Sequence, residues 1–207
     1  HETLTLRMKI RLAAEQSWRT SRTLVVLGRR SGDFDLRIND FPPNTGGCKV
    51  PGCINGEGGG LVFLGGDGSQ QTGDLVVHGG TLMFGDVDAV SSATTIRIVS
   101  NSAVVDLFNT TEAIGGLAGG GEMRIGLGLL QTGDANNALD EFTGALVGSG
   151  TFEKRGSGLM RLAGNNTAFT GLTKITAGTL EIAGDSDALN DAARVEVAAG
   201  ARLVIGG

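Results

Sequence analysis

The stretch that decides the fold lies at residues 148–180 and reads GSGTFEKRGSGLMRLAGNNTAFTGLTKITAGTL. Apolar and polar residues alternate in it in short runs; Met160 and Leu162, for example, flank Arg161. Runs of this kind recur along the chain and end in glycine, asparagine, aspartate or serine. Alternation with a period of two, punctuated by turn residues, predicts short β-strands that each bury one side.

An internal repeat extends this pattern over most of the chain. Residues 60–64 align with 158–162, and 80–82 align with 178–180, without a gap and at a spacing of 98 residues. A repeat made of several strand-and-turn units is typical of a solenoid, in which each coil buries its apolar side on the next. With coils of roughly 20–25 residues, we expect about eight or nine rungs and a rod on the order of 40 Å long.

The alternation also assigns each strand residue to the inside or the outside of the rod, because successive side chains in a strand point to opposite faces. In the second copy the charged residues fall at the outward positions. The outward set is Leu61, Met83, Arg161 and Glu181. The inward set is Val62, Leu64, Val77, Leu82 and Phe84 in the first copy, and Met160, Leu162, Ile175, Leu180 and Ile182 in the second.

The composition agrees with a solenoid and excludes several other classes. The chain has 36 glycines but 3 prolines, 1 tryptophan and no tyrosine, while apolar residues make up 40% of it. The glycines have no collagen period, and the apolar content is too high for a disordered chain. A net charge of −5 argues against a nucleic-acid partner. No apolar run approaches the ~20 residues of a membrane span, so we expect no membrane insertion.

Residues 148–166 resemble a known family. They fit the pattern G-S-G-x-L-x-K-x-G-x-G-x-L-x-L-x-G-x-N of the passenger-associated repeat of autotransporters, and the A-G-T-L continuation is present at 177–180. A lead-in similar to that of the family stands at 114–121. We therefore interpret 1–207 as one β-helix segment, with the clearest repeat in 114–207. The half at 1–113 is divergent, since Gly56 stands where the family has lysine.

The resemblance implies an all-β fold, a right-handed parallel β-helix, and a secreted or cell-surface protein of Gram-negative bacteria. Such a passenger is exported through the periplasm and the outer membrane by its own C-terminal β-barrel translocator, which these 207 residues do not contain. We expect the segment to engage host cells or surfaces, as an adhesin or a receptor-binding virulence effector. The alternative is a purely structural secretion stem for an upstream functional domain. A β-helical polysaccharide-active enzyme shares the architecture, but we expect no enzyme and no cofactor.

Cys48 and Cys53 are the two cysteines of the chain and lie in a proline- and glycine-rich stretch. This stretch, at 39–60, interrupts the strand pattern, so it should project from the rod as a loop. Projecting loops often carry binding functions, although we favour a simple insertion without a binding role. An extracytoplasmic setting favours a local Cys48–Cys53 disulfide. Zinc would need two more ligands, and neither His1 nor His78 has ligand spacing, so no metal is predicted.

Basic side chains are concentrated near the start of the chain. Arg7, Lys9 and Arg11 share one side of a predicted strand, and Arg29 and Arg30 could extend the basic surface. Such a patch could bind a host cell-surface receptor or an anionic glycan. The alternative is an ordinary solvated strand face.

Paired carboxylates follow the repeated G-T-L strand in both copies, namely Asp86 and Asp88, and then Asp185, Asp187 and Asp191. A glycosidase would place two carboxylates around the scissile bond. Here they fall in predicted turns without an aromatic platform for a sugar, so turn chemistry explains them better. His78 has no recognisable nucleophile or carboxylate partner in the sequence, which leaves a catalytic triad unsupported.

Overall fold

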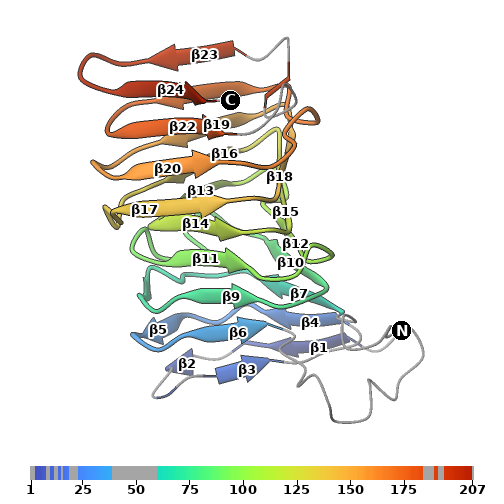
Figure 1. Cartoon of the computed structure of the whole chain (residues 1–207). Helices are drawn as coiled ribbons and strands as arrows, with labels where there is room; N and C mark the ends of the chain where they lie inside the picture. Colours follow the sequence, from blue (N-terminus) through green and yellow to red (C-terminus); the bar gives the residue numbers. More distant parts are fainter. Residues whose placement is uncertain are drawn as a thin grey trace.

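In the computed structural model the chain is a stack of parallel β-coils (Figure 1). The structure describes residues 3–7, 10–11, 14, 16–18, 23–38, 60–183, 189–190 and 194–206. All secondary-structure elements within these ranges are β-strands, and every pair of neighbouring strands is parallel. No helix in the described part is long and apolar enough to cross a membrane. The predicted all-β solenoid is confirmed.

The strands form three faces that the chain visits in turn. The seven-stranded face contains β1 (Thr3–Leu6), β4 (Thr23–Val26), β7 (Leu61–Leu64), β10 (Thr81–Phe84), β12 (Val104–Asp106), β15 (Glu122–Gly126) and β18 (Ala145–Gly148). The nine-stranded face contains β3 (Gln16–Trp18), β6 (Leu36–Ile38), β9 (Leu75–Val77), β11 (Thr95–Ile98), β14 (Gly116–Gly119), β17 (Leu139–Phe142), β20 (Leu159–Leu162), β22 (Thr179–Ala183) and β24 (Arg202–Gly206).

The remaining face, here called the interrupted face, consists of two separate sheets. The three-stranded sheet contains β2 (Ile10–Arg11), β5 (Arg30–Gly32) and β8 (Gln70–Gln71). The five-stranded sheet contains β13 (Thr111–Ile114), β16 (Leu129–Thr132), β19 (Thr151–Lys154), β21 (Leu172–Ile175) and β23 (Arg194–Val197). Between them, the fourth coil passes from β10 to β11 without a strand on this face.

Coil length follows from the strand registers. One coil takes 18 residues where Val104 pairs with Glu122, and 23 where Thr81 pairs with Val104. Thr23 pairs with Leu61, so the coil that contains 39–59 is longer by about one coil length. The nine stacked strands of the longest face correspond to about eight turns. Cys48, Cys53 and the predicted projecting loop at 39–60, apart from Gly60, lie outside the described residues.

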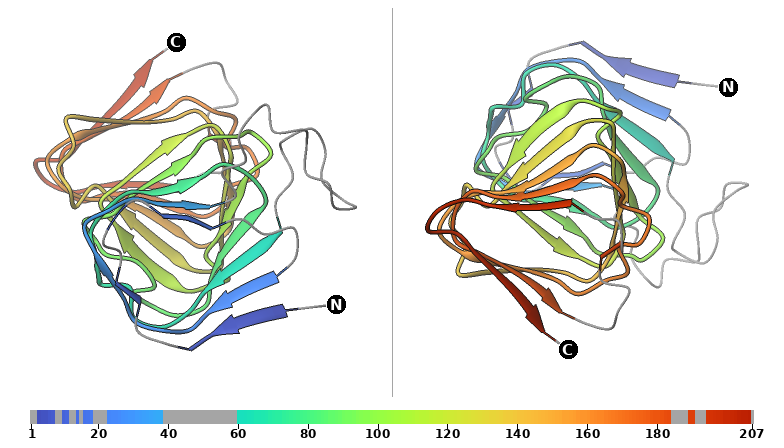
Figure 2. Two further views of the ribbon diagram at one scale, coloured as in Figure 1. Left: turned by 90° about the horizontal axis from the view of Figure 1, so that it is seen from below. Right: turned by 90° about the horizontal axis from the view of Figure 1, so that it is seen from above.

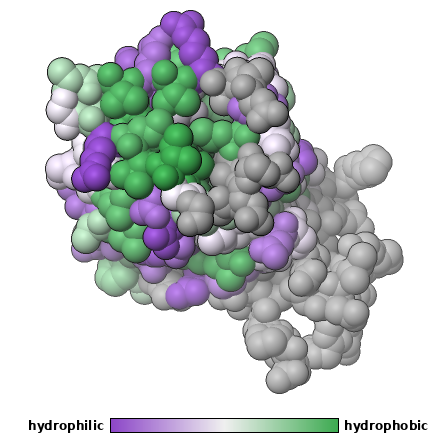
Figure 3. Space-filling model, turned by 45° about the horizontal axis from the view of Figure 1, so that its top comes forward, coloured by the Kyte–Doolittle hydropathy of each residue, from purple (hydrophilic) through white to green (hydrophobic). Residues whose placement is uncertain are grey.

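Seen along the rod, the strands surround a common interior (Figure 2). A continuous column of apolar side chains, mostly aliphatic and phenylalanine, forms the core between the three faces. All ten side chains predicted to point inward are at most 4% exposed, which confirms the assignment of faces. The column is uncovered beyond the last coil, where Val197 and Ile205 are 47% and 76% exposed (Figure 3). The alternation of side chains along each strand therefore determines which residues are buried in the coils for which the prediction was made.

The two copies of the 98-residue repeat match strand for strand, but they lie on different faces. β7 belongs to the seven-stranded face, whereas the corresponding β20 belongs to the nine-stranded face. β9 and β21 differ in the same sense, as do β10 and β22. The turn is also kept, because Gly80 and Gly178 have φ values of 67° and 66°, a left-handed region that suits glycine. From one copy to the next, the chain therefore makes four complete turns of the rod and then continues past two further faces. Equivalent strands of the repeat can thus occupy different faces.

Candidate functional sites along the rod

The predicted basic surface is only partly assembled in the described residues. Arg7 follows β1 and is exposed, while Lys9 and the side chain of Arg11 are outside the described part. Arg29 is exposed, and its Nε lies 3.0 Å from Asp67 Oδ2 in the next coil. The charge of Arg29 is therefore compensated locally, which weakens its contribution to a cationic patch.

Arg30 corrects the prediction, because its side chain is fully buried instead of contributing to a surface. It starts β5 on the interrupted face and points into the coil. Nη1 donates to Gly65 O at 2.8 Å and to Gly28 O at 3.3 Å, and Nη2 donates to Ala89 O. A Cβ on Gly68 would lie 2.8 Å from Nη2, so the absence of a side chain there leaves room for the guanidinium. One buried arginine thus connects three successive coils.

Glu112 reaches the same segment from the other side. It lies on β13, is fully buried, and its Oε1 accepts a hydrogen bond from Ala89 N at 3.1 Å, while Oε2 has no partner among the described residues. Burial raises the pKa of Glu112 to about 8, although bonds from Ala89 N and Val90 N oppose the shift. Burial also lowers the pKa of Arg30 to about 10. Arg30 therefore binds the carbonyl oxygen of Ala89 and Glu112 binds its amide N–H, at the level where the interrupted face lacks a strand.

On the outside of the rod, charged side chains form ladders that follow the strand register. Glu141, Arg161 and Glu181 pair in register on the nine-stranded face. Arg161 Nη2 lies 2.7 Å from Glu181 Oε1, and Nη1 lies 3.6 Å from Glu141 Oε1. The hydrogen bond to Glu181 and the negative charges of Glu181 and Glu141 raise the pKa of Arg161. Coils are about 4.8 Å apart, so opposite charges at one strand position meet naturally.

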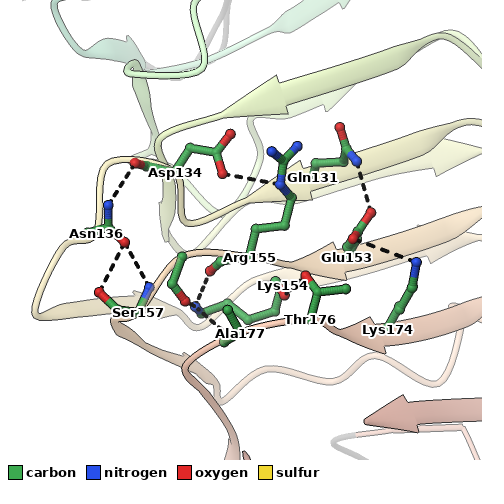
Figure 4. Close-up of polar contacts among 11 residues, drawn as sticks. Gln131, Asp134, Asn136, Glu153, Lys154, Arg155, Ser157, Lys174, Thr176 and Ala177 are labelled. Carbon is green, nitrogen blue, oxygen red and sulfur yellow. Dashed lines mark hydrogen bonds and ion pairs between the residues drawn. The ribbon is translucent and has the colours of Figure 1, made fainter. Parts of the chain in front are cut away.

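A second ladder runs along the five-stranded sheet (Figure 4). Gln131 Nε2 donates to Glu153 Oε2 at 2.9 Å, and Lys174 Nζ lies 3.8 Å from Glu153 Oε1. The register places Glu196 next, so polar and charged groups alternate over four strands. These outward side chains are mutually satisfied, which leaves little free charge for a ligand.

Lys154, the lysine of the family pattern, does not point outward. It shares the parity of the buried Phe152 on β19 and is 2% exposed. Its Nζ turns into the corner and donates to Arg155 O, to Gly156 O at 3.0 Å and to Ala177 O at 3.5 Å (Figure 4). Burial lowers the pKa of Lys154, while the carboxylates of Asp140 and Asp134 oppose the shift. The side chain of Lys154 therefore links the turn at Gly156 to Ala177 in the next coil.

Among the groups considered for catalysis, Asp86 and Asp88 have structural explanations. Asp86 Oδ2 accepts a bond from Gly66 N at 2.6 Å, and Asp88 has a turn conformation with φ 59°. Asp185, Asp187 and Asp191 are outside the described residues. His78 Nε2 lies 3.4 Å from Arg37 Nη1, beside an open depression formed by 99–102. Within the described ranges no three His, Cys, Asp or Glu side chains gather as metal ligands.

Comparisons with known proteins agree with the resemblance seen in the sequence. Residues 152–182 match the family model described as the passenger-associated-transport-repeat. Over 134 residues, 63% of this chain, the sequence is 33% identical to the Adhesin BmaC autotransporter of Brucella suis biovar 1 (strain 1330). The chain spans 4% of the length of that protein. No solved structure gives a significant match. The predicted resemblance to an autotransporter passenger is confirmed.

Proposed function

We propose that this chain, a segment resembling autotransporter passengers, forms part of the rod of a surface-displayed or released bacterial adhesin. The observation that carries the proposal is the unbroken parallel ladder of the nine-stranded face, in which each coil pairs with the next. Contacts in such a stack are local, so folding can propagate coil by coil as the chain emerges from the cell. The paired outward charges suit a rod that stands in water.

Several finer features belong to this proposal. The coil is right-handed, as parallel crossover connections almost always are. A loop at 39–60 projects from the rod and is closed by a Cys48–Cys53 disulfide, which an oxidising compartment favours. The segment is not an enzyme and carries no cofactor. Its own β-barrel translocator, encoded outside these residues, exports it to the Gram-negative cell surface.

A direct test of the rod role uses the parent protein. Deleting residues 1–207 in frame should reduce surface display or adhesion, because any coil that stacks on this segment loses its template. Surface immunolabelling and adhesion of bacteria to host cells would be measured together. Wild-type display and adhesion after the deletion would refute the proposal.

Direct engagement of host cells is the second candidate. It is favoured by the name of the similar adhesin and by the exposed Arg7, which Lys9 and Arg11 follow in the sequence. Their partner would be a host receptor or an anionic glycan. The virulence role of the segment depends on this second candidate.

If the basic residues bind an anionic glycan, the purified chain should bind heparin saturably and lose most of that binding between 50 mM and 300 mM salt. The double variant Arg7→Gln and Arg11→Gln should weaken binding at low salt by about tenfold, since it removes two of the three basic side chains predicted to share one side of this strand. Arg161→Gln is the matched control, because Arg161 is already paired with two glutamates. Equal binding by both variants, or none by the wild type, would leave only the rod role.

A further inference from the structure

The fourth coil is the place where the interrupted face loses its strand ladder. Residues 85–94 run between β10 and β11 and separate the three-stranded sheet from the five-stranded sheet. Backbone bonds at this level include Gly68 N to Asp88 O at 3.0 Å and Gly115 N to Thr94 O at 2.8 Å. Between these two bonds the side chains of Arg30 and Glu112 hold the segment at Ala89.

The two side chains do not have equivalent surroundings. The guanidinium of Arg30 donates to three carbonyl oxygens and faces the carboxyls of Glu112, Asp67 and Asp86, while only its Nε has no hydrogen-bond partner among the described residues. The carboxyl of Glu112 receives backbone N–H groups on one side only, and its buried Oε2 has no hydrogen-bond partner in the part of the chain that the structure describes. A negative charge on that oxygen would lack a hydrogen-bond donor in a buried site, which is costlier than leaving a neutral hydroxyl there. The geometry thus favours a protonated Glu112.

The charged groups around Glu112 reinforce this preference. From the coil below, Asp88 repels a negative charge on Glu112, while Arg30, which starts β5, attracts it. From the coil above, Leu130 pairs in register with Glu112 and brings no charge. Desolvation is the largest influence and also opposes ionisation.

We propose that the fourth coil is a pH-sensitive seam in the rod, closed while Glu112 holds its proton and loosened when Glu112 ionises. The unfolded carboxyl ionises near its ordinary pKa of 4.5, whereas the folded one does so at about 8. Between these values the folded state binds a proton that the unfolded state has released, so stability falls as pH rises. A rod with this seam is tightest in acid. The inference does not depend on the proposed adhesin role.

The test is unfolding of the 207-residue chain in guanidinium chloride at pH 5.0 and pH 8.5, followed by circular dichroism. We expect the wild-type midpoint to be clearly lower at pH 8.5, and Glu112→Gln, which cannot ionise, to remove most of that difference. Glu141→Gln is the matched control, because this carboxylate is exposed in the outer ladder. An undiminished pH dependence in Glu112→Gln would overturn the proposal.

A second variant and a second measurement locate the effect. Asp88→Asn removes the repelling charge and suits the left-handed turn at this position, so the fall in stability should be smaller and should end at a lower pH than in the wild type. Hydrogen exchange, corrected for its intrinsic pH dependence, should show protection of 85–94 lost at pH 8.5 in the wild type but kept in Glu112→Gln. Equal loss across 60–183 would mean global unfolding and would contradict a local seam.

Discussion

Replacing Arg30 by alanine should lower the free energy of unfolding by about 3–5 kcal/mol, the range for removing one member of a buried charged network. The substitution leaves the carbonyl oxygens of Gly65 and Ala89 without their buried donors. It also removes the cation nearest to Glu112, so the cost should grow above pH 8. Denaturation in guanidinium chloride, followed by far-UV circular dichroism, would give the difference.

Arg29 provides the control for this prediction. It is the preceding residue, has the same side chain, and forms an exposed ion pair with Asp67. Arg29→Ala should therefore cost about 0–1 kcal/mol. Arg30→Lys should fall between the two, because an ammonium cannot reach the same acceptors as a planar fork. Equal costs for Arg29→Ala and Arg30→Ala would show that the buried contacts contribute nothing.

Lys154→Ala should destabilise the chain by about 2–3 kcal/mol, the order expected for losing charge-assisted hydrogen bonds in a buried corner. The acceptors Arg155 O, Gly156 O and Ala177 O belong to two coils, so the loss should be felt at the corner and in the coil above. Thermal and denaturant unfolding measure the global cost. Hydrogen exchange of residues 155–158 and 176–179 measures the local one.

Two further substitutions separate the causes at this corner. Lys154→Met keeps most of the buried stem and removes the ammonium, so it isolates the hydrogen bonds from packing. Lys174→Ala removes an outward lysine of the adjacent strand, whose ion pair with Glu153 is long at 3.8 Å. It should cost little. If Lys154→Met were as stable as the wild type, the carbonyl contacts would be unimportant and the stem alone would matter.

Sequence reasoning recovers the core of this fold because strand parity and burial are tightly linked. Leu82 and Leu180 lie in clear alternating runs, and the structure buries both. Arg30 was misplaced because its surroundings, GRRSG, contain no apolar residue from which parity could be read. Whether Arg29 or Arg30 points inward depends on the neighbouring coils, which lie far away in sequence.

The missed polar sites left different signals. Lys154 has the same parity as Phe152, so alternation alone could have placed it inside the rod. Glu112 alternates with Ala113 and Ile114 shares its parity, but a buried glutamate contradicts the usual preference of that residue. The strandless fourth coil could not be foreseen, because the segment at 85–94 differs little from other turn-rich stretches in composition. The register that brings Arg30 and Glu112 to Ala89 is a property of the stack.

The change of face between the two repeat copies has a consequence for how the molecule is encountered. If the repeat spanned a whole number of turns, equivalent outward side chains would lie one above another on the same face. Neighbouring molecules could then associate side by side through that face. Here the repeat does not span a whole number of turns. Phe63 and Arg161, which occupy equivalent positions in the two copies, therefore lie on different faces of the rod. A binding partner that contacts one face of the rod therefore does not meet the outward side chains of both repeat copies on that face, even though the sequence repeats.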